Sequence, residues 1–280
     1  MLCTLKEILD DAREKKYCVG MFDTFTLESA RGVVEAAEET KSPIILATVE
    51  SFIPGWSLEV VADLLLPIAK RASVPVGVHL DHGFTEGAIK RAIELGFTSI
   101  MYDCSTKPFD ENASLCAEMV DYAHKNGVSV ECELGNVALG EGGKSSEAGY
   151  QYTKPKEVEE FVARTNTDAL AIAIGTEHGV YSSKPVLNIE LIKEIRALTD
   201  AALVLHGGSG LSTEDFQNCI KAGIQKMNIY TDIGTAACEA SREALKDSST
   251  TIYELSLAMR DAVRKVAAEK MTIFGSNGKA

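Results

Sequence analysis

Short segments rich in Val, Ile, Ala and Leu recur along the chain about every thirty residues, as in a barrel of alternating strands and helices. Continuous apolar runs such as 169–175 are typical of strands covered on both faces of a parallel sheet. The stretches between these segments have the apolar spacing of amphipathic helices. The pattern predicts an α/β protein, a single (β/α)8 TIM barrel with strands at 17–22, 43–48, 74–80, 99–103, 128–134, 169–175, 202–206 and 226–230.

Helix boundary signals fit this order. Thr4 and Glu7 have the spacing of a capping box and predict an N-terminal helix before the first strand. After the last strand, apolar positions at helical spacing over 252–271 predict an extra C-terminal helix that caps the barrel or pairs subunits. The loop at 135–152 is long, and such loops are usually functional or mobile. Other helix starts are indicated by Thr85, Pro155 and Ser212, and helix ends by Gly96, Gly127 and Gly223.

Length and composition favour one domain over residues 1–280. The chain has 280 residues, 45% of them hydrophobic, and barrels of this length commonly form one domain. No apolar run approaches the roughly 20 residues that cross a bilayer, and the N-terminus lacks a signal-peptide core. Seven cysteines without a CxxC pair indicate reduced thiols. We therefore expect a cytoplasmic protein that does not bind membranes.

The charge of the chain limits its partners. A formal net charge of −13 argues against nucleic acid and anionic membranes, because both require clustered Lys and Arg. An anionic small substrate stays open, since backbone N–H groups at helix starts and a bound metal can supply local positive potential.

Polar side chains gather at the C-terminal ends of the predicted strands, which share the face where barrel enzymes build their sites. His82, His178 and His206 each lie at such an end. Three neutral imidazoles leave a divalent transition metal with an open coordination position, and Asp81 beside the first could transfer protons. The same pattern includes Asp23, Thr48, Glu50, Asp103, Glu131, Glu133, Thr176 and Asn228.

Several of these polar residues have simpler interpretations. We expect His79, inside a strand, and His124, on a helix, to be hydrogen-bonded structural residues. Glu131 and Glu133 face one side of the fifth strand, where burial without a cation would be costly. They either pair with the metal or a second cation, or hold basic groups and backbone amides. The two interpretations stay balanced for Glu131, the metal is favoured for Glu133, and Asp103 presents a similar choice.

The segment 206–213 joins the seventh strand to a helix. Its glycines let main-chain N–H groups approach an anionic oxygen closely, although a tight turn would explain a glycine loop alone. The segment is followed by 228–231 after the eighth strand, and together they match the common phosphate location in barrels. We therefore expect a phosphate group to bind here.

Taken together, the motifs resemble those of class II ketose-bisphosphate aldolases, the family of fructose- and tagatose-bisphosphate aldolases. The likeness keeps the same order and runs from about Leu5 to the C-terminus. The motifs that carry it are Leu-Asp-His-Gly (80–83), Met-Tyr-Asp (101–103), Val-Glu-Cys-Glu-Leu-Gly (130–135), Ala-Ile-Gly-Thr-Glu-His-Gly-Val-Tyr (173–181), Leu-His-Gly-Gly-Ser-Gly-Leu (205–211) and Lys-Met-Asn-Ile (226–229).

The resemblance implies a zinc-dependent enzyme that reversibly cleaves a phosphorylated ketose into dihydroxyacetone phosphate and an aldehyde. It implies that His82, His178 and His206 bind Zn²⁺. It also implies that Asp81 is the catalytic acid and base, taking the proton of the C4 hydroxyl in cleavage and returning it in condensation.

Further roles follow from the same resemblance. Glu141 matches a catalytic glutamate that moves a proton at the nascent carbanion, and Asp103 and Glu133 match secondary metal positions. Relatives often use a monovalent cation, Na⁺ or K⁺, beside the phosphate, and they suggest a homodimer or homotetramer. The positions expected to bind dihydroxyacetone phosphate are Gly179, Gly207, Gly208, Ser209, Asn228, Tyr230 and Thr231.

The chain departs from the family pattern around the aldehyde. Asp23 stands where much of the family has Asn, which exchanges an amide donor for an acceptor. Tyr230 stands where fructose-bisphosphate enzymes tend to have Asp and tagatose-bisphosphate enzymes Ala. Thr106 replaces a frequent His, and Ser182 stands where some relatives place a phosphate-binding Lys. The residues expected to bind dihydroxyacetone phosphate match the family pattern. The residues around the aldehyde do not match either the fructose- or the tagatose-bisphosphate enzymes well.

Other functions remain open on sequence grounds. The aldehyde could be unphosphorylated, the metal could activate water in a zinc hydrolase, or the chain could be a non-catalytic sugar-phosphate binder. The last has no need of Asp81. A Schiff-base aldolase would need a lysine that projects from a strand into the site, and no predicted strand ends in one.

Overall fold

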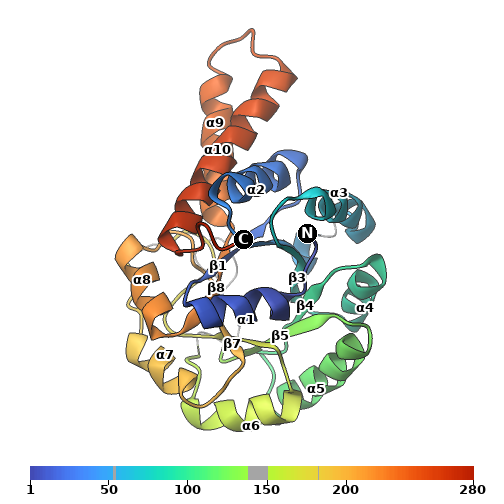
Figure 1. The fold of residues 1–280 in the computed structure, drawn as a ribbon, viewed down its shortest axis with the longest axis vertical. Helices are drawn as coiled ribbons and strands as arrows, with labels where there is room; N and C mark the ends of the chain where they lie inside the picture. Colours follow the sequence, from blue (N-terminus) through green and yellow to red (C-terminus); the bar gives the residue numbers. More distant parts are fainter. Residues whose placement is uncertain (53–54, 138–150, 182) are drawn as a thin grey trace.

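The computed structural model describes residues 1–52, 55–137, 151–181 and 183–280. Eight parallel strands form a closed barrel in chain order, and the last strand pairs with the first (Figure 1). The predicted TIM barrel is confirmed. Its strands are β1 (Val19–Asp23), β2 (Ile44–Val49), β3 (Val76–Gly83), β4 (Ser99–Tyr102), β5 (Ser129–Leu134), β6 (Ala169–Ile172), β7 (Ala202–Leu205) and β8 (Ile224–Ile229).

Helices surround the barrel, and α1 (Leu5–Lys15) lies across its N-terminal end (Figure 1). The predicted capping box of Thr4 and Glu7 begins α1, and Thr85 and Ser212 cap their helices as expected. Because α1 closes one end, the opposite end is left for a site. The surrounding helices are α2 (Leu27–Thr40), α3 (Leu58–Arg71), α4 (Glu86–Leu95), α5 (Phe109–Lys125), α6 (Pro155–Thr165), α7 (Ile189–Arg196) and α8 (Thr213–Ala222), with a short 3-10 helix η1 (Glu50–Phe52) after β2.

The core has two apolar layers because successive strand side chains point to opposite faces. Outward-facing residues such as Phe22 and Leu46 pack against the surrounding helices. Inward-facing residues such as Met21 and Ile45 pack with Leu9 of α1 inside the barrel. This burial on both faces explains the continuous apolar runs in the sequence.

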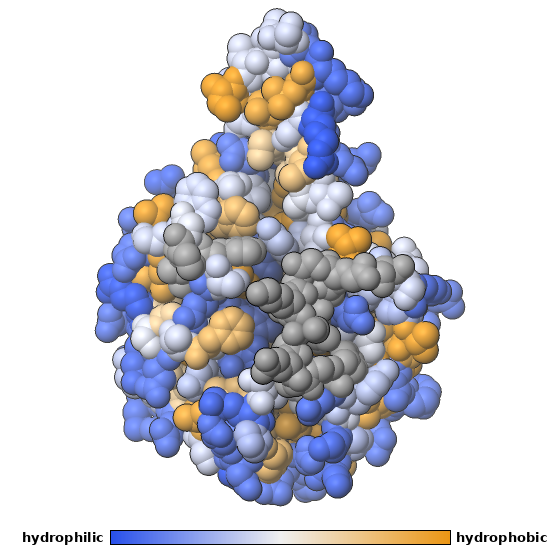
Figure 2. All heavy atoms as spheres, turned by 180° about the vertical axis from the view of Figure 1, so that it is seen from behind, coloured by the Kyte–Doolittle hydropathy of each residue, from blue (hydrophilic) through white to orange (hydrophobic). Residues whose placement is uncertain are grey.

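The chain ends in a helical arm formed by α9 (Thr231–Ala244) and α10 (Ile252–Ile273), which projects from the barrel (Figure 1). The predicted terminal helix is therefore present, but it packs along α2 and α9 and does not cover an end of the barrel. At the contact with α2, a Cβ on Gly32 would lie 2.7 Å from the Arg260 carbonyl oxygen. Apolar side chains are exposed near the end of the arm (Figure 2), including Leu245, Ile252 and Tyr253.

Two strand ends differ from the sequence prediction by three residues, and the other boundaries differ by at most two. β6 ends at Ile172, three residues early, because the Ala173 N–H bonds to the Thr153 side chain and its carbonyl accepts the Thr153 N–H. β3 continues to Gly83, three residues beyond the prediction, so Asp81 and His82 lie within the strand. The apolar pattern reports burial, whereas strand ends depend on which backbone groups find partners.

Candidate active site

His82, His178 and His206 meet at the C-terminal mouth of the barrel. One ring nitrogen from each lies within 4.8 Å of the others, and the rings of His82 and His178 have centroids 5.0 Å apart. Nitrogens bound to one tetrahedral Zn²⁺ lie about 3.4 Å apart, so small rotations would bring this donor set onto one ion. The described residues therefore fit a metal that prefers imidazole, as the sequence predicted.

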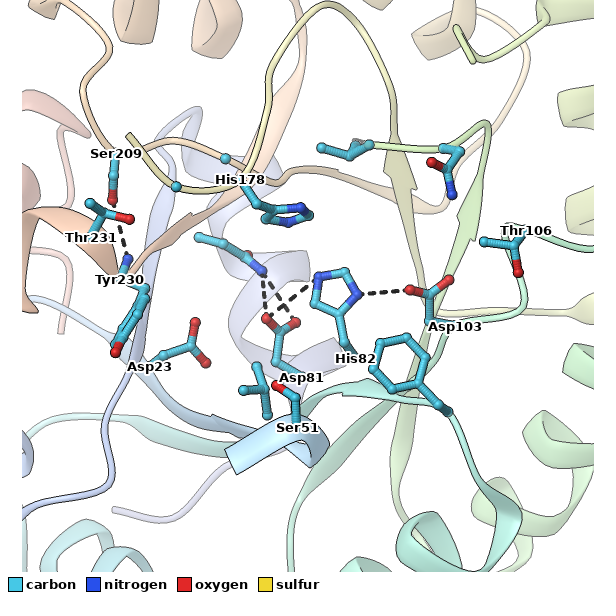
Figure 3. Close-up of a pocket in the computed structure, with 17 residues that line it drawn as sticks. Asp23, Ser51, Asp81, His82, Asp103, Thr106, His178, Ser209, Tyr230 and Thr231 are labelled. Atoms are coloured by element: carbon cyan, nitrogen blue, oxygen red, sulfur yellow. Dashed lines mark hydrogen bonds and ion pairs between the residues drawn. The ribbon is translucent and has the colours of Figure 1, made fainter. Parts of the chain in front are cut away.

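The backbone and Asp103 orient His82. His82 has φ of 42°, an unusual value for a residue other than glycine, at a register shift between Leu80 and Gly83. Its Nδ1 donates to Asp103 Oδ2 at 2.9 Å (Figure 3). Burial raises the pKa of Asp103, but hydrogen bonds from His82 and Ser105 outweigh it and hold that pKa below its usual range. The ionised carboxylate directs His82 Nε2 toward the other imidazoles.

Two imidazoles of the cluster, His82 and His206, contact each other through their ring nitrogens. Burial lowers the pKa of His82, but Asp81 and Asp103 outweigh it and raise the pKa to about 10. Burial holds the pKa of His206 well below its usual range, so His206 is neutral. His82 Nε2 lies 2.8 Å from His206 Nδ1 and can donate its proton to it. A metal binding to both nitrogens must displace the proton.

Glu131 orients His206 through a hydrogen bond. Its Oε1 accepts from His206 Nε2 at 2.8 Å, which leaves His206 Nδ1 facing the cluster. Its Oε2 lies 2.9 Å from Lys226 Nζ, and both side chains are fully buried. The sequence left the role of Glu131 open, and the structure places it between basic groups.

Lys226 is a buried cation that the sequence reasoning missed. It lies inside β8 and also donates to Asn228 Oδ1 at 2.8 Å. Its ammonium therefore lies near the site although Lys226 does not stand at the C-terminal end of a strand. Lys226 and Asn228 are two residues apart on one strand and share a face. A lysine inside an apolar strand, on the face of a candidate site residue, was the signal that could have identified it.

Asp81 faces the open side of the imidazoles. It is 2% exposed, accepts from Asn228 Nδ2 at 3.2 and 3.3 Å, and has Oδ2 3.9 Å from His82 Nε2 (Figure 3). This position suits proton transfer to a ligand on the metal. His79 is buried and bonded to Ser99 at 2.9 Å, and His124 bonds to Asp168 at 2.8 Å, so both histidines are hydrogen-bonded as expected.

Glu133 lies behind His82 and Asp103. Burial, reinforced by Asp103, raises the pKa of Glu133 to about 8. Its Oε1 accepts the Val137 N–H at 3.1 Å, and donor atoms of Glu133, His82 and Asp103 lie within 4.8 Å of one another. This group could hold a second cation, whereas the Glu131 carboxylate already pairs with Lys226.

The loop after β7 and the start of α9, with Gly179, form a cradle at the cavity that is lined by Gly179, Gly207, Ser209 and Thr231. Ser209 Oγ accepts from Tyr230 N–H at 3.3 Å and Asp232 N–H at 3.2 Å, which joins the two segments. Gly207 has φ of 66°, and a Cβ there would lie 2.3 Å from the Glu177 carbonyl oxygen. The N-terminus of α9 adds a positive helix dipole. These features suit a phosphate.

A cavity of about 450 Å³ opens above the imidazoles. Gly208 lies under the cradle, where a Cβ would lie 2.9 Å from the Asn228 carbonyl oxygen. Glu141 and Ser182 lie outside the described residues. The candidate residues that line the cavity are Asp81, His82, Asp103, His178, Gly179, Gly207, Ser209, Asn228, Tyr230 and Thr231.

Tyr181 connects the two loops that carry His178 and His206. Its hydroxyl accepts the Glu177 N–H at 3.1 Å and donates to the Gly207 carbonyl at 2.7 Å. Each bonded residue is the neighbour of a histidine of the cluster, so Tyr181 sets the distance between the two imidazoles. In the sequence, Tyr181 is distinguished only as the last residue of the motif at 173–181.

We predict that Tyr181→Phe weakens zinc binding about tenfold, because partners of metal ligands commonly contribute 10- to 100-fold to affinity. Competition with a chromogenic chelator measures the change. Tyr253→Phe, on an exposed side chain of α10, is the matched control. Unchanged affinity in Tyr181→Phe would show that the loops keep their spacing without the hydroxyl.

The fold and the site define an enzyme of the parallel-barrel class with a histidine cluster suited to a metal. The family model described as "Fructose-bisphosphate aldolase class-II" matches residues 3–279. The chain belongs to this class II aldolase family and is an aldolase, a carbon–carbon lyase. The resemblance predicted from the motifs is confirmed.

Similar proteins cover the whole chain. A fructose-bisphosphate aldolase of Geobacillus stearothermophilus is 42% identical over 100% of this chain and 99% of its own. The protein YdjI of Escherichia coli K12 is 40% identical over the full length of both chains. The crystal structure of the YdjI aldolase superposes with a TM-score of 0.91 at 39% identity, covering all of both chains. A putative fructose-1,6-bisphosphate aldolase from Coccidioides immitis also has a TM-score of 0.91, at 30% identity, covering 98% of this chain and 97% of its own. Among the described residues, no helix is both long and apolar enough to span a membrane.

Proposed function

We propose that the chain is a zinc-dependent aldolase that reversibly cleaves a phosphorylated ketose, similar to fructose or tagatose bisphosphate in the half that becomes dihydroxyacetone phosphate, into that product and an aldehyde. The observation that carries this proposal is the convergence of His82, His178 and His206 beside Asp81 at the mouth of the barrel. The zinc that these imidazoles would hold supplies Lewis acidity toward a ketone oxygen.

The residues around the imidazoles have distinct roles in this proposal. Asp81, held by Asn228, takes the proton of the C4 hydroxyl in cleavage and returns it in condensation. The cradle of Gly179, Gly207, Ser209 and Thr231 binds the phosphate of dihydroxyacetone phosphate through N–H groups and the dipole of α9, and Gly208 supports it from beneath with its own N–H on the Asn228 carbonyl. Asn228 and Tyr230 line the cavity between the cradle and the aldehyde.

Further assignments extend the proposal. Glu141 moves a proton at the carbanion carbon, Asp103 and Glu133 serve as secondary metal positions, and a monovalent Na⁺ or K⁺ lies beside the phosphate. We also propose a single domain over 1–280, a cytoplasmic location and a homodimer or homotetramer. The apolar side chains exposed near the end of the arm support assembly, because such surface is usually covered.

Proton exchange tests the proposal without any aldehyde. In D₂O, the zinc-loaded protein should exchange one C3 proton of dihydroxyacetone phosphate for deuterium, observed by NMR, well above the rate without protein. Borohydride added with this substrate should leave no adduct on the protein, because no step uses a Schiff base. Absence of exchange, or a reduced adduct on Lys226, would refute the proposed mechanism.

A further inference from the structure

We propose that the aldehyde half of the substrate is an unphosphorylated polyhydroxy aldehyde, bound by the Asp23 carboxyl against an aromatic wall formed by Phe25, Trp56 and Tyr230. This inference rests on the proposed aldolase function and names the acceptor of the same site. Three independent features carry it: an unsatisfied buried carboxyl, the charge of the cavity and the aromatic wall.

Asp23 presents a buried carboxyl to the cavity. It ends β1, is 6% exposed, and its Oδ1 has no hydrogen-bond partner among the described residues. Figure 3 places it between Tyr230 and Asp81, on the side of the cavity away from Asp103. A buried polar atom without a partner is costly, and a ligand hydroxyl would supply that partner. Either form of the carboxyl can accept such a bond, although burial and Asp81 raise the pKa of Asp23 well above its usual range.

The charge of the cavity disfavours a second phosphate. Its described lining contains three carboxyl side chains, Asp23, Asp81 and Asp103, and no Lys or Arg. In the proposed function, the phosphate of dihydroxyacetone phosphate binds in the cradle beside Ser209. A phosphate on the aldehyde would instead lie near Asp23, where no described Lys or Arg compensates its charge and an ionised carboxyl would repel it.

The aromatic wall begins at Tyr230, which lines the cavity beside Asp23 (Figure 3), and continues through Phe25 to Trp56. The Phe25 ring has its centroid 6.3 Å from that of Tyr230 and 6.5 Å from that of Trp56. Tyr230 is 38% exposed and Trp56 47% exposed, so ring surface remains uncovered at the mouth. Apolar ring faces beside a few polar groups suit a sugar chain, which offers C–H groups on one side and hydroxyls on another. A carboxyl next to these rings therefore selects hydroxyls over phosphate.

Matched pairs of aldehydes test the inference. Condensation with dihydroxyacetone phosphate is measured for D-glyceraldehyde and D-glyceraldehyde 3-phosphate, and for D-erythrose and D-erythrose 4-phosphate. We expect kcat/KM to be at least about tenfold higher for the unphosphorylated member of each pair, because a like charge near Asp23 is costly. A preference for the phosphorylated members would overturn the inference.

Asp23→Asn isolates the carboxyl because it keeps the size of the side chain and removes the ionisable group. It should lower kcat/KM for the neutral aldehydes, raise it for the phosphorylated ones and shift their ratio about tenfold. Asp63→Asn, the same change on the exposed face of α3, should leave the ratio as it is. Trp56→Ala, at an exposed ring, should raise KM for D-erythrose and remains informative if Asp23→Asn misfolds.

Exchange of the C3 proton separates the two proposals. If exchange occurs but phosphorylated aldehydes are preferred, the aldolase function stands and the acceptor assignment is wrong. If Asp23→Asn reduces exchange as much as condensation, Asp23 acts on the dihydroxyacetone phosphate half and the assignment is also wrong. Absence of exchange in the unaltered protein would remove the function and this inference together.

Discussion

Asp81→Ala is expected to lower turnover by about 100- to 10,000-fold, the usual contribution of a general acid or base, while zinc content stays unchanged. The reason is geometric. Asp81 Oδ2 lies 3.9 Å from His82 Nε2, and Asn228 holds both carboxylate oxygens, so the carboxylate faces a ligand on the metal without belonging to the imidazole cluster. Steady-state assays and metal analysis of the same samples measure the two quantities.

Two comparisons sharpen the Asp81 experiment. Asp81→Asn keeps the shape of the side chain and its contact with Asn228, and should be nearly as inactive because an amide cannot take the proton. Asp63→Asn on exposed α3 is the surface control. Loss of zinc in proportion to activity would assign Asp81 to metal binding and remove its proposed role as a base.

Removal of the metal is expected to abolish activity, with a loss of at least about 1,000-fold, and added Zn²⁺ should restore it. His206→Ala should lose zinc outright, because it removes one of three imidazoles and leaves Glu131 Oε1 without the N–H that it accepts. Metal content, and activity before and after dialysis against a chelator, measure these effects. Circular dichroism of the metal-free protein confirms that the barrel is intact.

The metal-free state also makes zinc affinity depend on pH. The pKa of His82 is about 10, so below that pH the metal must displace the proton held between His82 and His206. Apparent affinity should therefore rise with pH up to about 10, as titrations at several pH values would detect. Persistent activity in protein shown to contain no metal would be incompatible with the proposed mechanism.

Much of the site was predictable because barrel topology converts positions along the chain into positions in space. His82, His178 and His206 are far apart in sequence, yet each follows or ends a strand, and parallel strands bring those ends together. The loop after β7 was identifiable as a candidate phosphate site for the same reason. Motif resemblance added the expected roles of Asp81 and Asn228.

Other features depend on contacts that the pattern does not encode. The left-handed backbone at His82, the Lys226–Glu131–His206 chain and the bridge from Tyr181 require distances between side chains on different strands and loops. β6 ends earlier than the sequence predicted because the Ala173 N–H donates to the side chain of Thr153, which lies in a loop distant in sequence. The helical arm projects from the barrel because α10 packs against α2 and α9.

By itself, the sequence determined the barrel, its strand order and the face that carries the chemistry, because burial on both sides of a parallel sheet leaves a periodic apolar signal. The tertiary structure alone decided how each imidazole is oriented, which carboxylates pair with Lys226 and His82, and that Asp23 lines the cavity with an Oδ1 that has no hydrogen-bond partner among the described residues. These properties depend on ångström-scale distances between residues remote in sequence, and local apolar periodicity carries no record of such distances.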